Sequence, residues 1–190
     1  MNERYQLDRY YESAKVLLLK AEQLFLEREA TEPFLGVRVD PKGPHLSFEP
    51  EGRPGVWVEL SPSTLQYPDQ ALHQIAHEVI HLLAPTRCPP TIMLEEGLAV
   101  WFSLHGPAFS DARYKLEAIT HIYAVGGPIN YRDALDLYNE LLAVDQNAVV
   151  ALRGREPRLW SLKPSLIQET LRPIDPNLAT RLCERREMRP

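Results

Sequence analysis

The chain has 190 residues, of which 44% are hydrophobic and 25% charged, and its formal net charge is -5. This composition is typical of a globular protein, and the length predicts one domain with a sizeable core. An acidic chain without a basic stripe does not look like a nucleic-acid-binding protein. We interpret the Arg-rich run 181–189 as the solvated face of a helix, because Glu184 and Glu187 interrupt it.

Cysteine usage and the lack of targeting signals predict a cytoplasmic protein. Cys88 and Cys183 are far apart and match no zinc-ribbon or redox spacing, which fits a reducing compartment. The first ten residues are charged and lack the apolar core of a signal peptide. No run approaches the roughly 18 apolar residues that a membrane span needs, so we expect no membrane partner.

The first third of the chain is expected to form a long helix and then a small sheet. Residues 5–29 place apolar side chains every three or four positions, as a core-packed helix does. The next segment, 31–62, is rich in proline and glycine, which separate short β-like runs. The runs are Phe34–Val39, His45–Phe48 and Val56–Leu60. They predict a small antiparallel or mixed sheet.

The rest of the chain is expected to be mainly helical. Ser63 or Asp69 could cap a helix that ends near Leu83, and a proline-rich turn then leads into a helix over 91–105. Further helices are predicted at 111–124, 131–144, 148–155 and 176–187. The order of elements indicates an α+β fold in one domain. Its parts are 1–30 (helix), 31–62 (sheet), 63–105 (paired helices) and 106–190 (helical remainder).

The most informative stretch is His77-Glu78-Val79-Ile80-His81. Two histidines four residues apart lie on one face of a helix, so their imidazoles can converge on one zinc ion. Glu78 would sit beside the metal as a general base for a zinc-bound water. Such a short pattern also arises by chance on helices that bind no metal.

A third ligand is available downstream at Glu96, in the segment Leu94-Glu95-Glu96-Gly97-Leu98-Ala99. A turn within the intervening residues can reverse the chain, so that a second helix presents Glu96 to the metal. Gly97 lets the two backbones approach closely. The ligand set would then be His77, His81 and Glu96, with one position left open.

The His77-Glu78-x-x-His81 motif followed by Glu96-Gly97-x-Ala99 resembles the gluzincin branch of zinc metallopeptidases. This branch includes the thermolysin-like and aminopeptidase families. The resemblance covers about residues 55–104 and implies a zincin-like fold, one zinc ion per chain, and Glu78 as the base. It also implies that Val56–Leu60 lines the cleft, with an extended peptide near Trp57. The interval before Glu96 is shorter than in the aminopeptidases, and their exopeptidase signature is not recognisable.

Several other residues could also take part in the metal site or its chemistry. Glu95 would ligate if the helical register differs by one, and otherwise supports the site or faces solvent. His73 forms a stripe with His77 and His81 but lies too far along the helix to share one ion, and we expect it at the rim of the cleft. Cys88 is expected to be a buried or exposed thiol that does not bind the metal. A donor to the oxyanion could come from one of four residues: Tyr123, Tyr131, Tyr138 and His121.

The sequence therefore predicts a zinc-dependent metallopeptidase that hydrolyses a peptide or protein substrate. Two alternatives stay open at this stage. One is a zincin-fold binding or regulatory module without turnover, and the other is a metal-free helical interaction protein. The substrate and the oligomeric state are not indicated by any residue pattern.

Overall fold

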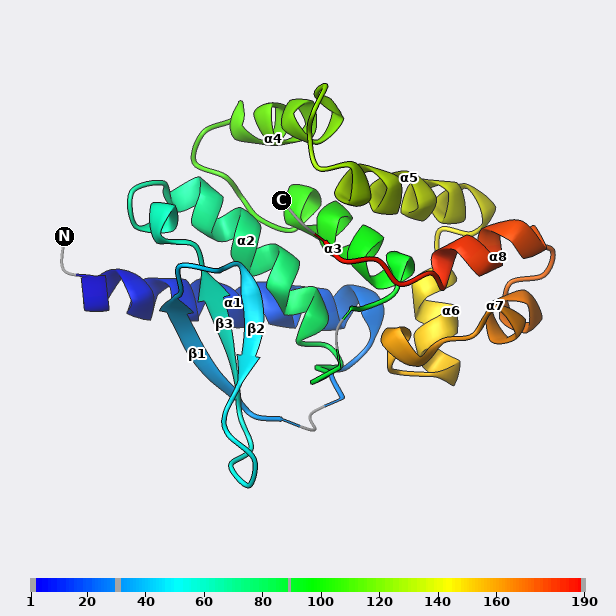
Figure 1. Ribbon diagram of the computed structural model, residues 1–190, viewed down its shortest axis with the longest axis horizontal. Helices are drawn as coiled ribbons and strands as arrows, with labels where there is room; N and C mark the ends of the chain where they lie inside the picture. Colours follow the sequence, from blue (N-terminus) through cyan, green and yellow to red (C-terminus); the bar gives the residue numbers. More distant parts are fainter. Residues whose placement is uncertain (1–2, 30–31, 89, 189–190) are drawn as a thin grey trace.

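The computed structural model describes residues 3–29, 32–88 and 90–188, arranged as in Figure 1. Within these residues a three-stranded sheet is combined with helices, which confirms the α+β class. The predicted boundary between residues 30 and 31 lies outside the described residues. The α-helices are α1 (Glu3–Phe25), α2 (Pro68–His81), α3 (Met93–His105), α4 (Tyr114–Tyr123), α5 (Ile129–Val144), α6 (Ala148–Arg155), α7 (Pro164–Thr170) and α8 (Pro176–Leu182), and short 3-10 helices lie at Pro62–Leu65 and Leu159–Ser161.

Helix α1 packs against α2 and the sheet through one apolar face. The side chains that it buries recur every three or four residues, as the sequence pattern predicts. They are Tyr10, Ala14, Leu17, Leu18, Ala21 and Phe25. The helix ends at Phe25 and not near residue 29, because Leu26 has a φ of 73°, which is outside the helical region.

The three predicted strands are confirmed as β1 (Phe34–Val39), β2 (His45–Phe48) and β3 (Val56–Leu60). Strand β3 lies in the middle, parallel to β1 and antiparallel to β2, so the sheet is mixed. Because β3 is paired on both sides, the prediction that a substrate lies along it near Trp57 is wrong. The free strand edge that faces the helices of the predicted site belongs to β2 (Figure 1).

Helix α2 begins at Pro68, whose fixed φ suits the first turn of a helix. Neither of the two predicted residues caps it. Ser63 lies in the preceding 3-10 helix. The carboxylate of Asp69 accepts hydrogen bonds from the backbone amides of Ser110 and Asp111, at 2.8 Å each. Asp69 therefore fixes the loop that follows α3 onto the start of α2.

Helix α3 lies between α2 and α5 and is buried along almost its whole length. A helix surrounded in this way needs a small residue where a neighbouring backbone comes closest. Gly97 is that residue, because a Cβ at this position would overlap the backbone oxygen of Ala134 in α5 and lie 2.8 Å from the Cβ of Tyr138. The close approach expected at Gly97 is thus present, but toward α5 and not α2.

We expect Gly97→Ala to lower the free energy of unfolding by about 1–3 kcal/mol, the usual effect of forcing atoms into a packed core. Gly154→Ala is the matched control, since Gly154 is also helical but the nearest atom to its Cβ would be 4.0 Å away. The control should be neutral or more stable by up to about 1 kcal/mol. Chemical denaturation measures both, and equal stabilities would contradict the close packing.

The buried Arg153 of α6 ties distant parts of the chain together. Its side chain is 2% exposed. The guanidinium donates hydrogen bonds to backbone oxygens at the end of α1, beyond α2 and beyond α6. The acceptors are Phe25, Leu26, Glu27, Leu83 and Pro157. These bonds satisfy carbonyl groups that would otherwise be buried unpaired.

The prediction of a helix up to residue 187 is wrong, because α8 ends at Leu182. Residues 183–188 run back across α3, where Arg185 forms an antiparallel bridge with Ile92 (the red segment in Figure 1). Helix α7 was not predicted. Among the described residues, no helix has the length and apolar character needed to cross a membrane.

Candidate metal centre

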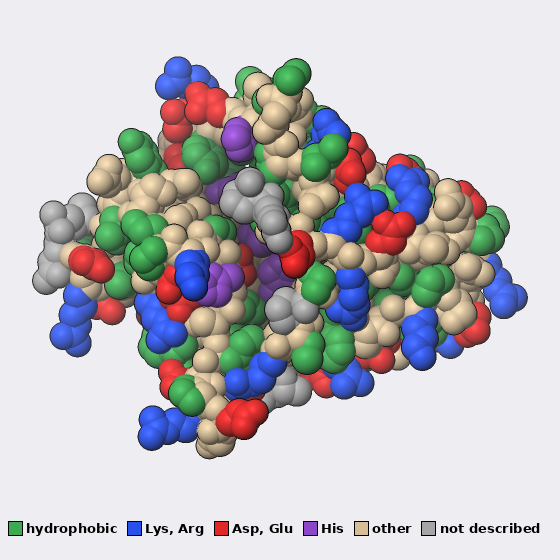
Figure 2. All heavy atoms as spheres, viewed as in Figure 1, with side chains coloured by type: hydrophobic (Ala, Val, Ile, Leu, Met, Phe, Trp, Pro, Cys, Tyr) green, Lys and Arg blue, Asp and Glu red, His purple; other side chains and the backbone are tan. Residues whose placement is uncertain are grey.

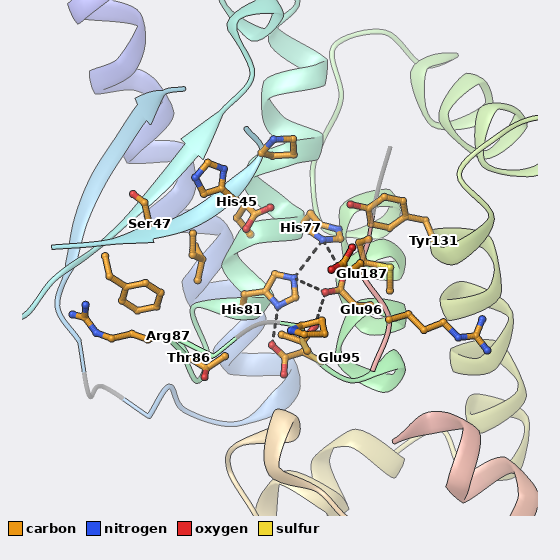
Figure 3. Close-up of a pocket in the computed structure, with 18 residues that line it drawn as sticks. His45, Ser47, His77, His81, Thr86, Arg87, Glu95, Glu96, Tyr131 and Glu187 are labelled. Carbon is orange, nitrogen blue, oxygen red and sulfur yellow. Dashed lines mark hydrogen bonds and ion pairs between the residues drawn. The ribbon is translucent and has the colours of Figure 1, made fainter. Parts of the chain in front are cut away.

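The predicted ligands come together at the contact between α2 and α3 (Figure 3). The Nε2 atoms of His77 and His81 are 3.4 Å apart. A carboxylate oxygen of Glu96 lies 3.5 Å from Nε2 of His77, and the other lies 3.8 Å from Nε2 of His81. Among the described residues, these three form the one group of His, Cys, Asp or Glu side chains placed to hold a metal ion.

The donor atoms and their spacing fit zinc. Ligands that surround a zinc ion tetrahedrally at about 2.05 Å are about 3.3 Å apart. The two Nε2 atoms are 3.4 Å apart, and a carboxylate oxygen of Glu96 lies 3.5 Å from Nε2 of His77, so both distances are close to this value. Two imidazoles and one carboxylate form a donor set typical of catalytic zinc, whereas calcium and magnesium prefer oxygen ligands alone.

Glu95 supports the site through the other nitrogen of His81. The Nδ1–H of His81 donates a hydrogen bond of 2.7 Å to Oε1 of Glu95, a residue that is 3% exposed. This contact holds the imidazole so that Nε2 faces the other ligands. The register in which Glu95 would itself ligate is therefore not the one observed. Burial raises the pKa of Glu95, and the neighbouring His81 opposes that shift.

The charges around the two histidines favour a cation at this point. Burial alone would lower the pKa of His81, but Glu96 and Glu95 outweigh it and raise this pKa to about 10. Burial would raise the pKa of Glu96, but His81 and His77 bring this pKa down to about 2. A metal ion would supply the positive charge that these carboxylates stabilise.

Glu78 lines the same pocket without belonging to the ligand group. It is 4% exposed, and burial raises its pKa, although the neighbouring His77 and His81 act against this shift. A buried carboxylate with a raised pKa is a stronger base than an exposed one. This is the property that the predicted role of Glu78 requires.

The candidate ligands lie at the bottom of a pocket of about 730 Å³, which is large enough for several residues of a peptide. One wall is β2 with the loop residues Thr86 and Arg87, and the opposite wall is Tyr131 with residues 186–188. Figure 2 shows histidine side chains at the bottom of this hollow near the middle of the visible face. The pocket is therefore a cleft between the sheet and the second half of the chain.

Tyr131 is the one of the four proposed oxyanion donors that lines the pocket. Its ring packs edge-on against His77, with centroids 5.7 Å apart. Burial and the carboxylates of Glu96 and Glu78 raise its pKa, so its hydroxyl keeps the proton that it would donate. The other three residues do not line the pocket: Tyr123 binds Asp136, Tyr138 packs on Trp101, and His121 is exposed on α4.

His73 and Cys88 lie apart from the metal group. His73 packs its ring against Phe109 and Tyr114 and does not line the pocket, so its expected place at the cleft rim is wrong. Burial, with a smaller effect of His77, lowers the pKa of His73 to about 4. Cys88 is an exposed free thiol.

Comparisons with family models, curated proteins and solved structures found no match to this chain. Its function has therefore to be inferred from its own residues and their geometry.

Proposed function

We propose that this chain is a zinc-dependent metallopeptidase with a zincin-like fold, in which His77, His81 and Glu96 hold one zinc ion. The observation that carries the proposal is the convergence of the two Nε2 atoms and the Glu96 carboxylate at spacings suited to zinc, with Glu78 beside them. A metal-free interaction protein accounts poorly for three nearly buried glutamates around two histidines. Buried carboxylates without sufficient counter-charge destabilise a fold.

The substrate would be an extended peptide that lies in the cleft beside β2. The free edge of this strand can form main-chain hydrogen bonds with a peptide, as in strand addition. Such bonds would hold the scissile carbonyl over the ligand group independently of the peptide sequence. His45 of this strand lines the cleft (Figure 3), whereas the hydroxyl of Ser47 donates a hydrogen bond to Glu59 of β3.

Zinc, when bound, would polarise the scissile carbonyl and lower the pKa of water. Glu78 takes a proton from the attacking water, which adds to the carbonyl carbon. The Tyr131 hydroxyl donates a hydrogen bond to the developing oxyanion. Glu78 then passes its proton to the amine as the carbon–nitrogen bond breaks, so the base is restored.

The proposal is tested by metal content and activity of the purified chain. We expect about one zinc per chain in protein never exposed to a chelator. A mixed peptide library should be cleaved, 1,10-phenanthroline should stop the cleavage, and added zinc should restore it. A chain without zinc would overturn the metal site. A zinc-loaded chain that cleaves no peptide would indicate a binding module without turnover, the alternative left by the sequence.

A further inference from the structure

The hydroxyl of Thr91 contacts one of the proposed metal ligands. Thr91 lies just before α3 and lines the cleft. Its Oγ1 atom donates a hydrogen bond of 2.5 Å to Oε1 of Glu96. Neither the ligand group nor the proposed base accounts for this hydroxyl, so its position against the Glu96 carboxylate requires an explanation of its own.

The main chain on both sides of Thr91 is held by the extended segment that follows α8. On one side, Ile92 forms the antiparallel bridge with Arg185. On the other side, the guanidinium of Arg185 donates a hydrogen bond of 2.5 Å to the backbone oxygen of Pro90. Threonine is also branched at Cβ, which restricts its side-chain rotation. The hydroxyl is therefore presented to Glu96 from a fixed backbone by a stiff side chain.

The two carboxylate oxygens of Glu96 have different neighbours. Oε2 lies 3.5 Å from Nε2 of His77, whereas Oε1 lies 3.8 Å from Nε2 of His81 and accepts the hydrogen bond of Thr91. Figure 3 shows the carboxylate facing both histidines, and a carboxylate can bind a metal ion through one oxygen or through both. The hydrogen bond distinguishes the two oxygens, because an oxygen that accepts a hydrogen bond binds a metal ion less strongly.

We propose that Thr91 is a positioning residue, whose hydroxyl holds Oε1 of Glu96 so that this glutamate binds the metal ion through Oε2 alone. The inference rests on the proposed metal site. Two imidazoles and one carboxylate oxygen leave one position of a tetrahedral zinc ion for water, as catalytic sites require. Without the hydroxyl both oxygens of Glu96 bind, and the second one crowds the position of the water that Glu78 activates.

The test removes the hydroxyl and keeps the shape of the side chain. Thr91→Val does this, and Thr91→Ser restores the hydroxyl. Thr86→Val is the matched control, because Thr86 also lines the cleft but its hydroxyl oxygen accepts instead a hydrogen bond of 3.1 Å from the amide of Cys88. Each full-length protein is prepared without metal and then loaded with zinc or with cobalt(II). Cobalt(II) substitutes for zinc, and its visible absorption weakens as its coordination number rises.

We expect fully loaded Thr91→Val to lose part of the visible absorption of the cobalt(II) protein, because a second oxygen of Glu96 raises the coordination number. Thr91→Ser and Thr86→Val should keep the wild-type spectrum. Peptide hydrolysis by zinc-loaded Thr91→Val should fall by about 10- to 100-fold, the usual loss when a partner of a metal ligand is removed. Thermal unfolding of the metal-free proteins shows whether each variant has kept its fold.

An unchanged cobalt(II) spectrum in folded, fully loaded Thr91→Val would overturn the inference. The same loss of absorption in Thr91→Ser or in Thr86→Val would also overturn it, because the effect would then not depend on the Thr91 hydroxyl. A wild-type chain that binds neither metal would overturn the metal site and this inference together. The expected spectral change without any peptide cleavage by the wild-type chain would overturn only the peptidase proposal and would leave the role of Thr91 supported.

Discussion

Glu78→Gln is expected to lose about 10²- to 10⁴-fold of the peptide-hydrolysing activity, the range that a positioned general base supplies. The amide cannot accept a proton from water, but it has nearly the same shape as the carboxylate. Because Glu78 is not among the proposed ligands, zinc content should stay the same as in the wild-type chain. Initial rates on the best library peptide, together with elemental analysis, give both quantities.

Two further measurements make this result specific. Glu117→Gln introduces the same chemical change at an exposed position of α4 and should leave the rate unchanged. Thermal unfolding of Glu78→Gln shows whether the buried substitution has disturbed the fold. A well-folded, zinc-loaded Glu78→Gln protein with the wild-type rate would show that another group activates the water.

Neighbouring glutamates on α3 should respond differently to the same substitution. Glu96→Ala removes a proposed ligand atom, and we expect the purified protein to have lost most of its zinc. Glu95→Ala removes only the partner of His81 Nδ1, and residues in that position typically change metal affinity by about 10- to 100-fold. Competition with a chelator of known affinity measures both variants on one scale.

The comparison also tests the register of α3. If Glu95→Ala lost more zinc than Glu96→Ala, the ligand would be Glu95, and α3 would be rotated about its axis relative to its orientation in the structure. If both variants kept zinc with wild-type affinity, the histidines would bind the metal with other partners. Gln at either position is a useful second variant, because it keeps the side-chain volume in a site where both residues are nearly buried.

Local sequence patterns predicted the three strands, most of the helices and the grouping of His77, His81 and Glu96. The structure confirms the three strands. They could be predicted because apolar residues alternate between glycine- and proline-rich turns. Spacing of four residues puts His77 and His81 on one helix face. Glu96 was predicted from the turn that separates the two helices, and the structure brings it into the group.

Features that depend on long-range contacts could not be predicted in this way. The position of β3 between β1 and β2 is set by tertiary packing, so the strand beside the cleft was misassigned. Of the four candidate donors, only the packing of α5, which brings Tyr131 against His77, singles out Tyr131. The one signal for it in the sequence is its place near the start of a predicted helix, which by itself points to no function.

Residues 183–188 are a further example. Their mixed charges suit a solvated helix, and this is why a helix was predicted there. In the structure the same charges serve a different purpose, since Arg186 pairs with Asp133 of α5 and holds an extended segment in place. Glu187 was interpreted only as an interruption of a basic run, and its place on the cleft wall depends on contacts more than 50 residues away in the sequence.

The hydrogen bonds of Arg153 bear on the order in which the chain folds. They join residue 153 to carbonyl groups 126–128 residues earlier and to Leu83, only two residues after His81. Contacts of such high sequence separation form late, because closing long loops opposes them entropically. The end of α2 thus reaches its final environment only after α6 has docked. On a ribosome, the residues of the motif would emerge well before the part of the chain that holds them in place.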